Sequence, residues 1–151
     1  MQITDIKTYI TMPIQNLPWL FVEVHTDEGI TGLGECSWYG NNTLIQQGIE
    51  SVKPWVIGQD PANIEEIWQL IYRRHLRIGG RGPISAVISG IDIALWDIKG
   101  KALGVPVYQL LGGPSATMCR CTPTSMMPDR PRQSKKTWLW PARPKRTDIE
   151  Q

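Results

Sequence analysis

A chain of 151 residues with 41% hydrophobic and 20% charged residues has the size and composition of an ordinary globular domain with one core. No apolar run approaches membrane-spanning length, no basic-then-apolar leader is visible, and three cysteines make no even disulfide framework. We therefore expect a soluble, cytoplasmic protein without membrane contact.

Charge divides the chain into two parts. Up to Met118, eleven acidic residues face eight basic ones, a net charge of −3; from Cys119 onward, eight basic residues face three acidic ones, a net charge of +5. The second part also has five prolines and few branched aliphatic side chains, so it buries too little apolar surface to offset its ordering entropy. We expect a folded domain at residues 1–113 and a disordered basic tail at residues 114–151.

The opening third has the pattern of three β-strands, at residues 3–11, 19–27 and 30–37. A loop with two prolines, Met12–Trp19, is expected between the first two. In the second strand, alternate residues lie on opposite faces. One face has Leu20, Val22 and Val24, and the other has Trp19, Phe21 and His25. An Asp-Glu-Gly turn after it completes a three-stranded antiparallel meander.

Helical periodicity follows. Thr43 is expected to cap a helix that runs to residue 56, and Asn63 a second one. The longest helix begins at Pro83 and ends before Gly104, and its apolar stripe consists of Ile84, Ile88, Ile91, Leu95 and Ile98. The order β-β-β-α-α-α indicates an α+β fold, in which a helical bundle follows the meander.

Few residues form a pattern that catalysis or metal binding requires. The glycine-rich Gly79–Gly82 could bind a phosphate, but it lacks the Lys-Ser/Thr of a P-loop, so a hinge is favoured. His25 and His75 have no partner at metal-ligand spacing, and Cys119 and Cys121 form an isolated CxC. No metal site is expected.

Three charged residues stand out on the long helix. For Asp92, between two isoleucines, two interpretations stay open: a solvated or hydrogen-bonded turn of the helix, or a docking contact to a second domain. Asp97 and Lys101 are four residues apart with the acid first, which favours a surface ion pair.

The stretch SGIDIALWDIKGKALGVPVYQLLG, residues 89–112, resembles the signature of the amino-terminal domain in the mandelate racemase/muconate-lactonizing branch of the enolase superfamily. Val87 departs mildly, since alanine is usual there. The resemblance covers Met1 to about Gly113 in its order of elements and does not extend further. WYGNN and LWDIKGK are most similar to acid-sugar dehydratases of the galactonate type.

The resemblance implies a domain that caps a (β/α)-barrel. The barrel supplies Mg²⁺ ligands and the acid/base Lys or His, and the Mg²⁺ stabilises an enediolate formed by removal of the proton α to a carboxylate. The cap supplies specificity for a small sugar acid through two loops, which correspond to Met12–Trp19 and Trp38–Asn42. The residues expected to line the substrate pocket, each alternatively a plain loop residue, are Asn16, Trp19, Trp38, Tyr39 and Asn41.

A barrel takes roughly 250 residues, and 38 follow Gly113. We therefore expect the cap of a Mg²⁺-dependent acid-sugar dehydratase or racemase, truncated, with no catalytic or metal-binding residue of its own. Its exposed barrel-facing surface, near Asp92 and Trp96, would favour self-association. The alternative is a small binding protein whose basic tail, with Trp138 and Trp140, binds nucleic acid or another acidic partner. We expect no specific nucleic-acid binding.

The tail has a possible origin in the barrel itself. In the family that the chain resembles, Leu-Leu-Gly-Gly is followed shortly by a strand often similar to Val-Pro-Val-Tyr-Thr. Reading the codons from the third base of Met118 permits this strand, so we expect the tail to be an out-of-frame remnant of the barrel start; the alternative is a genuine divergent tail.

Overall fold

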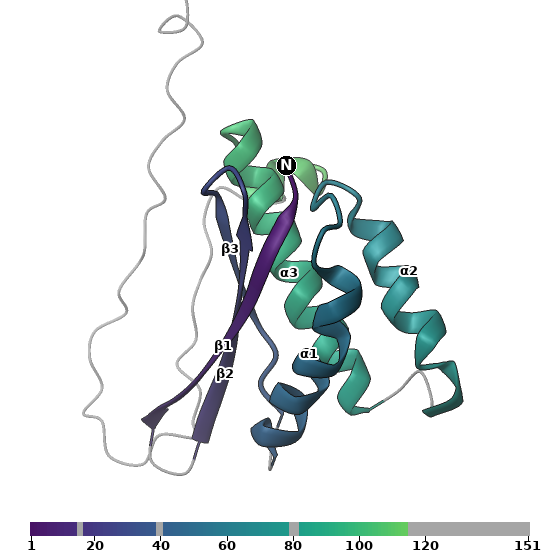
Figure 1. The fold of residues 1–151 in the computed structure, drawn as a ribbon. Coiled ribbons are helices and arrows are strands. Elements are labelled where there is room, and N and C mark those ends of the chain that lie inside the picture. The colour runs from purple at the N-terminus through teal and green to yellow at the C-terminus, as the bar shows by residue number, and fades with distance from the viewer. Residues whose placement is uncertain (15–16, 39–40, 79–81, 115–151) are drawn as a thin grey trace, which may run out of the picture. The chain divides into compact units, whose positions relative to one another are not determined.

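The computed structural model describes residues 1–14, 17–38, 41–78 and 82–114, and its contacts divide the chain into two units, Met1–Leu111 and Gly112–Gln151. Apart from Pro114, the expected tail lies outside the described residues, as do Gly79 to Arg81 of the expected hinge. The first unit has the predicted α+β architecture (Figure 1). Its elements are β1 (Ile3–Ile14), β2 (Leu17–Thr26), β3 (Thr31–Glu35), α1 (Asn42–Val56), α2 (Ile64–Arg74), the 3₁₀ turn η1 (Leu76–Ile78), α3 (Pro83–Leu103) and α4 (Val107–Leu110).

The sheet is an antiparallel meander in the order β1-β2-β3, as predicted. Leu20, Val22 and Val24 are fully buried on one face of β2, whereas Trp19 on the other face is exposed, which confirms the alternation expected for this strand. The β2–β3 turn places Gly29 at φ 78°, a left-handed conformation that glycine adopts without steric cost.

Strand pairing continues through most of the expected loop Met12–Trp19, so that prediction was wrong. Thr11 pairs with Trp19 and Ile14 with Leu17, so three steps along β1 lie opposite two along β2. The extra residue makes a β-bulge, a place where a strand tolerates proline because one ladder position is already unpaired. Trp19 is therefore a strand residue, held in register by the hairpin.

Helix α3 packs directly against the sheet because glycine removes side chains from both surfaces. A Cβ atom on Gly32 would lie 2.0 Å from the carbonyl oxygen of Ala94, and one on Gly34 would lie 2.0 Å from that of Gly90. A Cβ atom on Gly90 would in turn lie 2.7 Å from Cβ of Cys36. At Gly32 and Gly34 the strand thus meets the backbone of α3, and at Gly90 the helix meets a side chain of the segment after β3.

The helices form a layer on one face of the sheet (Figure 1). α1 and α3 contact the strands, and α2 packs on α1 and α3 without touching a strand in the described part of the chain. The predicted stripe of α3 lies in the core: Ile84 is partly buried and the other four members are buried. Contacts with β2, β3, α1, α2 and α4 surround α3, as its wide apolar surface indicates.

Helix ends match the prediction at α3 and differ at α1 and α2. α3 begins at its proline and ends before Gly104, whose φ is 67°. At α1 the cap is Asn41, not Thr43, because the Asn41 side-chain oxygen accepts a hydrogen bond from Leu44 N–H at 3.0 Å. At α2, Asn63 occupies the cap position but makes no side-chain cap bond.

Two side chains of α3 form hydrogen bonds with backbone groups on the outer edge of β3. Asp97 Oδ2 accepts a hydrogen bond from Leu33 N–H at 2.9 Å, and Lys101 Nζ donates to the Thr31 carbonyl at 2.7 Å. Lys101 Nζ also lies 2.7 Å from Asp97 Oδ2, so the predicted ion pair forms. The pair occupies backbone groups that an open edge would offer to another strand.

The opposite edge is occupied along the first half of β1. Lys53 Nζ donates to the Ile6 carbonyl at 2.9 Å and forms an ion pair with Asp5 Oδ1 at 2.6 Å. The loop after α1 meets Ile3, whose N–H donates to Gln59 and whose carbonyl accepts from Gly58. The sheet is thus closed to strand addition at these positions.

Candidate functional site

Three of the five predicted site residues lie in the described part of the chain, at one end of the first unit. Trp19 is near the start of β2, and Trp38 and Asn41 lie between β3 and α1; the two segments share the end of the unit at which α1 begins (Figure 1). Trp19 is 36% exposed and Trp38 37%, so both indole rings are accessible to a ligand. Asn16 and Tyr39 lie outside the described residues.

The Asn42 side chain joins these two segments. Its Oδ1 accepts a hydrogen bond from Trp38 N–H at 2.8 Å, and its Nδ2 donates to the Pro18 carbonyl at 2.9 Å. Asn42 is only 5% exposed, yet it belongs to the first turn of a surface helix. A buried amide with both ends bonded fixes the position of both partners.

A second set of contacts continues the sheet beyond the end of β3. Cys36 N–H donates to the Leu20 carbonyl at 3.0 Å, and Leu20 N–H donates to Ser37 Oγ at 3.0 Å. The Ser37 hydroxyl in turn donates to Glu35 Oε1 at 2.7 Å. The segment that carries Trp38 therefore leaves the sheet in a defined direction.

Sequence reasoning identified Asn41 as a candidate and missed the role of its neighbour. The side-chain oxygen of Asn41 is committed to the cap of α1, so only its amide nitrogen remains for a ligand. The hydrogen bonds that join the start of β2 to Trp38, in the segment after β3, are made by Asn42 instead. The available signal was the Asn-Asn pair ahead of a helix, where a single side chain is needed for capping.

Three other polar or reactive side chains have defined environments. Burial raises the pKa of the Cys36 thiol to about 12, so this cysteine is neutral and a poor nucleophile at physiological pH. On the outer sheet face, Tyr9 Oη donates to Glu23 Oε2 at 3.0 Å, and this hydrogen bond raises the pKa of the tyrosine. His25 Nε2 lies 3.2 Å from the same carboxylate oxygen but is not aligned for a hydrogen bond.

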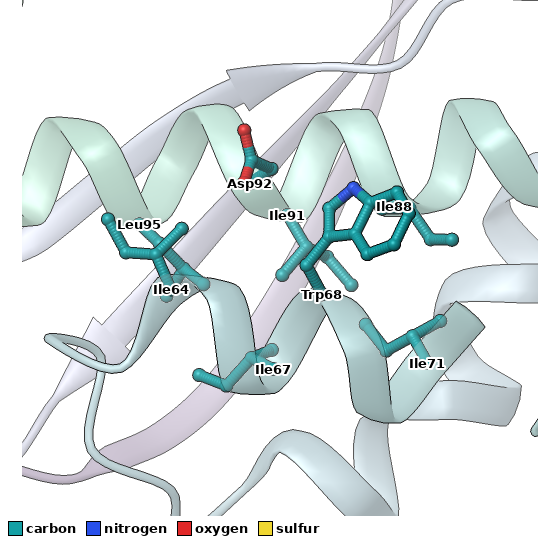
Figure 2. Close-up of a pocket in the computed structure, with 8 residues that line it drawn as sticks. All are labelled: Ile64, Ile67, Trp68, Ile71, Ile88, Ile91, Asp92 and Leu95. Carbon is teal, nitrogen blue, oxygen red and sulfur yellow. The ribbon is translucent and has the colours of Figure 1, made fainter. Parts of the chain in front are cut away.

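Asp92 lies in a crevice between α2 and α3 that is otherwise apolar. Figure 2 shows it beside Trp68, and the other lining residues are Ile64, Ile67, Ile71, Ile88, Ile91 and Leu95. The crevice has no room for a water molecule, and in the described residues the carboxylate has no hydrogen-bond partner. Burial first, and the charge of Glu65 second, raise its pKa. Among the described residues the hydrogen-bonded turn has no partner to support it, whereas a partly solvated turn and a docking contact both stay open for this half-buried group.

A shallow surface hollow of about 400 Å³ lies beside this crevice, at the start of α2. Trp96 and Lys99 form its α3 side, with Lys99 Nζ 5.3 Å from the centre of the Trp96 ring. Within the described ranges, no three His, Cys, Asp or Glu side chains are grouped closely enough to hold a metal ion. None of the helices in these ranges is both long and apolar enough to cross a bilayer.

Comparison with known proteins identifies relatives of the first unit. The profile of the family "Mandelate racemase / muconate lactonizing enzyme, N-terminal domain" matches residues 6–112. A D-galactonate dehydratase from Verminephrobacter eiseniae is 50% identical over 113 residues, which are 75% of this chain and 28% of that protein. The chain thus spans little more than a quarter of the length of this relative.

Solved structures agree with the sequence relatives. The 3,6-anhydro-D-galactonate cycloisomerase from Zobellia galactanivorans matches with a TM-score of 0.73 and 35% identity, over 80% of this chain and 34% of that one. An enolase from Pantoea ananatis with bound D-gluconate and Mg matches with a TM-score of 0.70 and 41% identity, over 77% and 28%. The matched part in each case is about a third or less of a longer chain.

Proposed function

The chain belongs to the mandelate racemase / muconate lactonizing enzyme family by its N-terminal domain, and from this we propose that residues 1–113 are the substrate-capping domain of a sugar-acid dehydratase. The observation that carries the proposal is the 50% identity to a D-galactonate dehydratase over 113 residues. The substrate class is a small polyhydroxylated carboxylate, the class to which galactonate and gluconate belong.

The end of the unit with Trp19 and Trp38 faces the substrate in this proposal. Their exposed indole rings offer apolar faces to the C–H surfaces of a sugar chain, and they exclude water from the reacting carboxylate. The amide nitrogen of Asn41 supplies a hydrogen-bond donor at the same end. Asn16 and Tyr39 stay candidates for the same pocket.

The Mg²⁺ that accompanies gluconate in the Pantoea structure has no counterpart here, because the described residues do not offer a group of ligands that fits it. In this proposal the metal and the acid/base groups belong to a barrel domain. The face of α3 with Asp92 and Trp96 docks against that barrel. An isolated chain would leave this face uncovered and self-associate, which sedimentation at several concentrations measures.

The test uses a hybrid enzyme. In it, residues 1–113 of this chain replace the matching segment of the Verminephrobacter dehydratase, and dehydration of galactonate and gluconate is measured with Mg²⁺. We expect turnover by the hybrid and none by the 151-residue chain alone. A folded hybrid without turnover of any sugar acid would contradict the proposal, as would chelator-sensitive turnover by the chain alone.

Tryptophan variants of the hybrid locate the pocket. Trp19→Phe or Trp38→Phe should raise KM by roughly tenfold, the equivalent of about 1.4 kcal/mol of lost contact. The control is Trp55→Phe, since Trp55 contacts His75 and Arg74 at the other end of α1. Equal effects at all three positions would indicate general destabilisation and contradict the pocket assignment.

A further inference from the structure

The Asn42 side chain is the outermost of the contacts that join β2 to the segment after β3. It bonds a backbone N–H on one segment, at Trp38, and a backbone carbonyl on the other, at Pro18. Both bonding partners are close to the candidate site. Pro18 precedes the site candidate Trp19, and Trp38 is an exposed site candidate.

We propose that Asn42 is a positioning residue that makes the start of β2 and the segment between β3 and α1 act as one recognition unit. The inference rests on the proposed function, because it assigns the coupling to the two segments that would contact the substrate. A ligand that orders Trp38 would thereby order Trp19, without any contact between the two rings being required.

The chemistry of the site requires an amide. One end must accept from an N–H and the other must donate to a carbonyl, and the Asn42 residue that makes both bonds is only 5% exposed. Asparagine supplies both functions on a short side chain, whereas aspartate supplies the acceptor alone unless it is protonated. An unpaired carbonyl next to a buried carboxylate is unfavourable, so the Pro18 bond is the one that aspartate would break.

Among the residues that the structure describes, no other hydrogen bond joins Trp38 to the start of β2. The Asn41 oxygen is engaged by Leu44 N–H in the helix cap. The Ser37–Leu20 bond joins the same two segments, but it lies before Trp38 in the chain, whereas the Asn42 bonds involve Trp38 itself. Without Asn42, only the bonds of Leu20 with Cys36 and Ser37 would join the two segments in the described residues, and we expect the coupling between the two exposed tryptophans to weaken.

The experiment uses the complete 151-residue chain labelled with 5-fluorotryptophan, and its signals are assigned by single Trp→Phe variants. In Asn42→Asp at neutral pH, the ¹⁹F signals of both Trp19 and Trp38 should broaden, while those of Trp55 and Trp68 stay unchanged. Acidification should restore both signals, because a protonated carboxyl group can again donate to the Pro18 carbonyl. The unsubstituted chain at each pH corrects for Glu35, which accepts the Ser37 hydroxyl.

Two further variants separate coupling from other effects. Asn42→Ala removes both bonds without adding charge and should broaden both signals at every pH. Asn63→Asp adds a carboxylate at the start of α2, where asparagine makes no side-chain cap bond, and should leave both signals sharp.

A change at Trp38 alone would reduce Asn42 to a local contact and overturn the proposal. So would the absence of acid rescue, or loss of the Trp55 and Trp68 signals in Asn42→Asp, which would make the contact a general stability element. No sugar acid is present in these spectra. A negative NMR result would therefore not contradict the proposed function, which the turnover of the hybrid enzyme tests. Likewise, an inactive hybrid would not contradict the coupling of the two segments.

Discussion

Glycine at three positions sets the distance between α3 and the sheet. At Gly34 the missing side chain would meet a backbone oxygen at 2.0 Å, and backbone cannot move aside as the end of a flexible side chain can. A glycine inside a strand pattern by itself indicates only a weaker strand. Its actual role depends on which helix lies above it, which the strand pattern does not contain.

Gly34→Ala should therefore destabilise the first unit by about 3 kcal/mol or more, at or beyond the usual cost of overpacking. Urea unfolding followed by circular dichroism measures the change. The control is Gly29→Ala, where an added Cβ meets open space and only the left-handed backbone is penalised, by about 1–2 kcal/mol. Equal losses at the two positions would show that close packing against α3 is not limiting.

Asp92 should make stability depend on pH in an unusual direction for a carboxyl group. Its pKa is raised in the folded state, so its favourable contribution is fully present below the unfolded value of about 3.9 and is lost as pH rises through the folded value. At pH 7, Asp92→Asn should thus be more stable than the parent, by an amount that solvent screening keeps small because the carboxylate is only partly buried.

Thermal unfolding between pH 4 and pH 7 measures this difference. The advantage of Asp92→Asn should shrink towards pH 4, whereas Glu66→Gln, on the exposed side of α2, should show no such trend. A stability difference that does not change with pH would mean that Asp92 is ionised at little cost in the folded state.

At the scale of elements, the Asp97–Lys101 pair shows how α3 serves the sheet. A surface ion pair alone contributes little, typically 0 to about 1 kcal/mol. Here the same two side chains also satisfy Leu33 N–H and the Thr31 carbonyl on an edge strand. Removing the acceptor leaves a strand amide unpaired and opens the edge to another chain.

Asp97→Leu should accordingly lower stability by about 1–2 kcal/mol and raise aggregation. Asp97→Asn, which keeps an acceptor for Leu33 N–H, should lose much less. Amide hydrogen exchange at Leu33 distinguishes them: fast in the leucine variant and slow in the asparagine variant. Equal exchange in both would show that Asp97 does not protect the edge.

The existence and order of these elements could be predicted from local pattern, as could both ends of α3, whereas the ends of the first hairpin and the start of α1 could not. The alternation of apolar residues in β2 and their spacing of three and four in α3 indicate which side chains are buried, and those side chains are buried or partly buried in the structure. The two prolines in Met12–Trp19 favoured the prediction of a loop there. The hairpin instead continues through a bulge, whose position depends on the pairing between the strands. At α1, Asn41 and Thr43 are both good caps, and tertiary contacts of Asn42 decide between them.

At the scale of the whole molecule, the α3 signature predicted the family whose profile matches residues 6–112. The close approach of Gly32 and Gly34 to the backbone of α3 leaves little space for larger side chains at Gly90 and Ala94. The candidate site was predicted only in part. Exposed aromatic residues near loops can be found in a sequence, but the bond between Asn42 and Pro18 joins residues 24 positions apart. That contact exists only once the sheet and α1 are assembled.

We propose, finally, that the residues after Met118 are translated out of frame from the start of a barrel. Reading begins at the third base of the Met118 codon. Methionine is always ATG and cysteine begins with TG, so the first shifted codon is GTG, valine. The Cys121–Thr122 junction gives only tyrosine or histidine, Met126–Met127 gives aspartate, and Met127–Pro128 gives alanine. The remaining codons permit Val-Pro-Val-Tyr-Thr-His-Val-Asp-Asp-Ala-Gly-Ser-Pro, a strand followed by a turn.

The nucleotide sequence tests this directly. We expect the frame shifted by two bases from the start of the Met118 codon to stay open for roughly 250 codons, the length of a barrel, and to encode acidic residues at the ends of successive strands. The similarity to the dehydratase relative, which covers 113 residues of this chain, should then resume in the shifted frame. An early stop codon in that frame, or an open frame without this similarity, would mean that the basic segment is a genuine part of the protein. Its tryptophans would then have to be explained by a partner of their own.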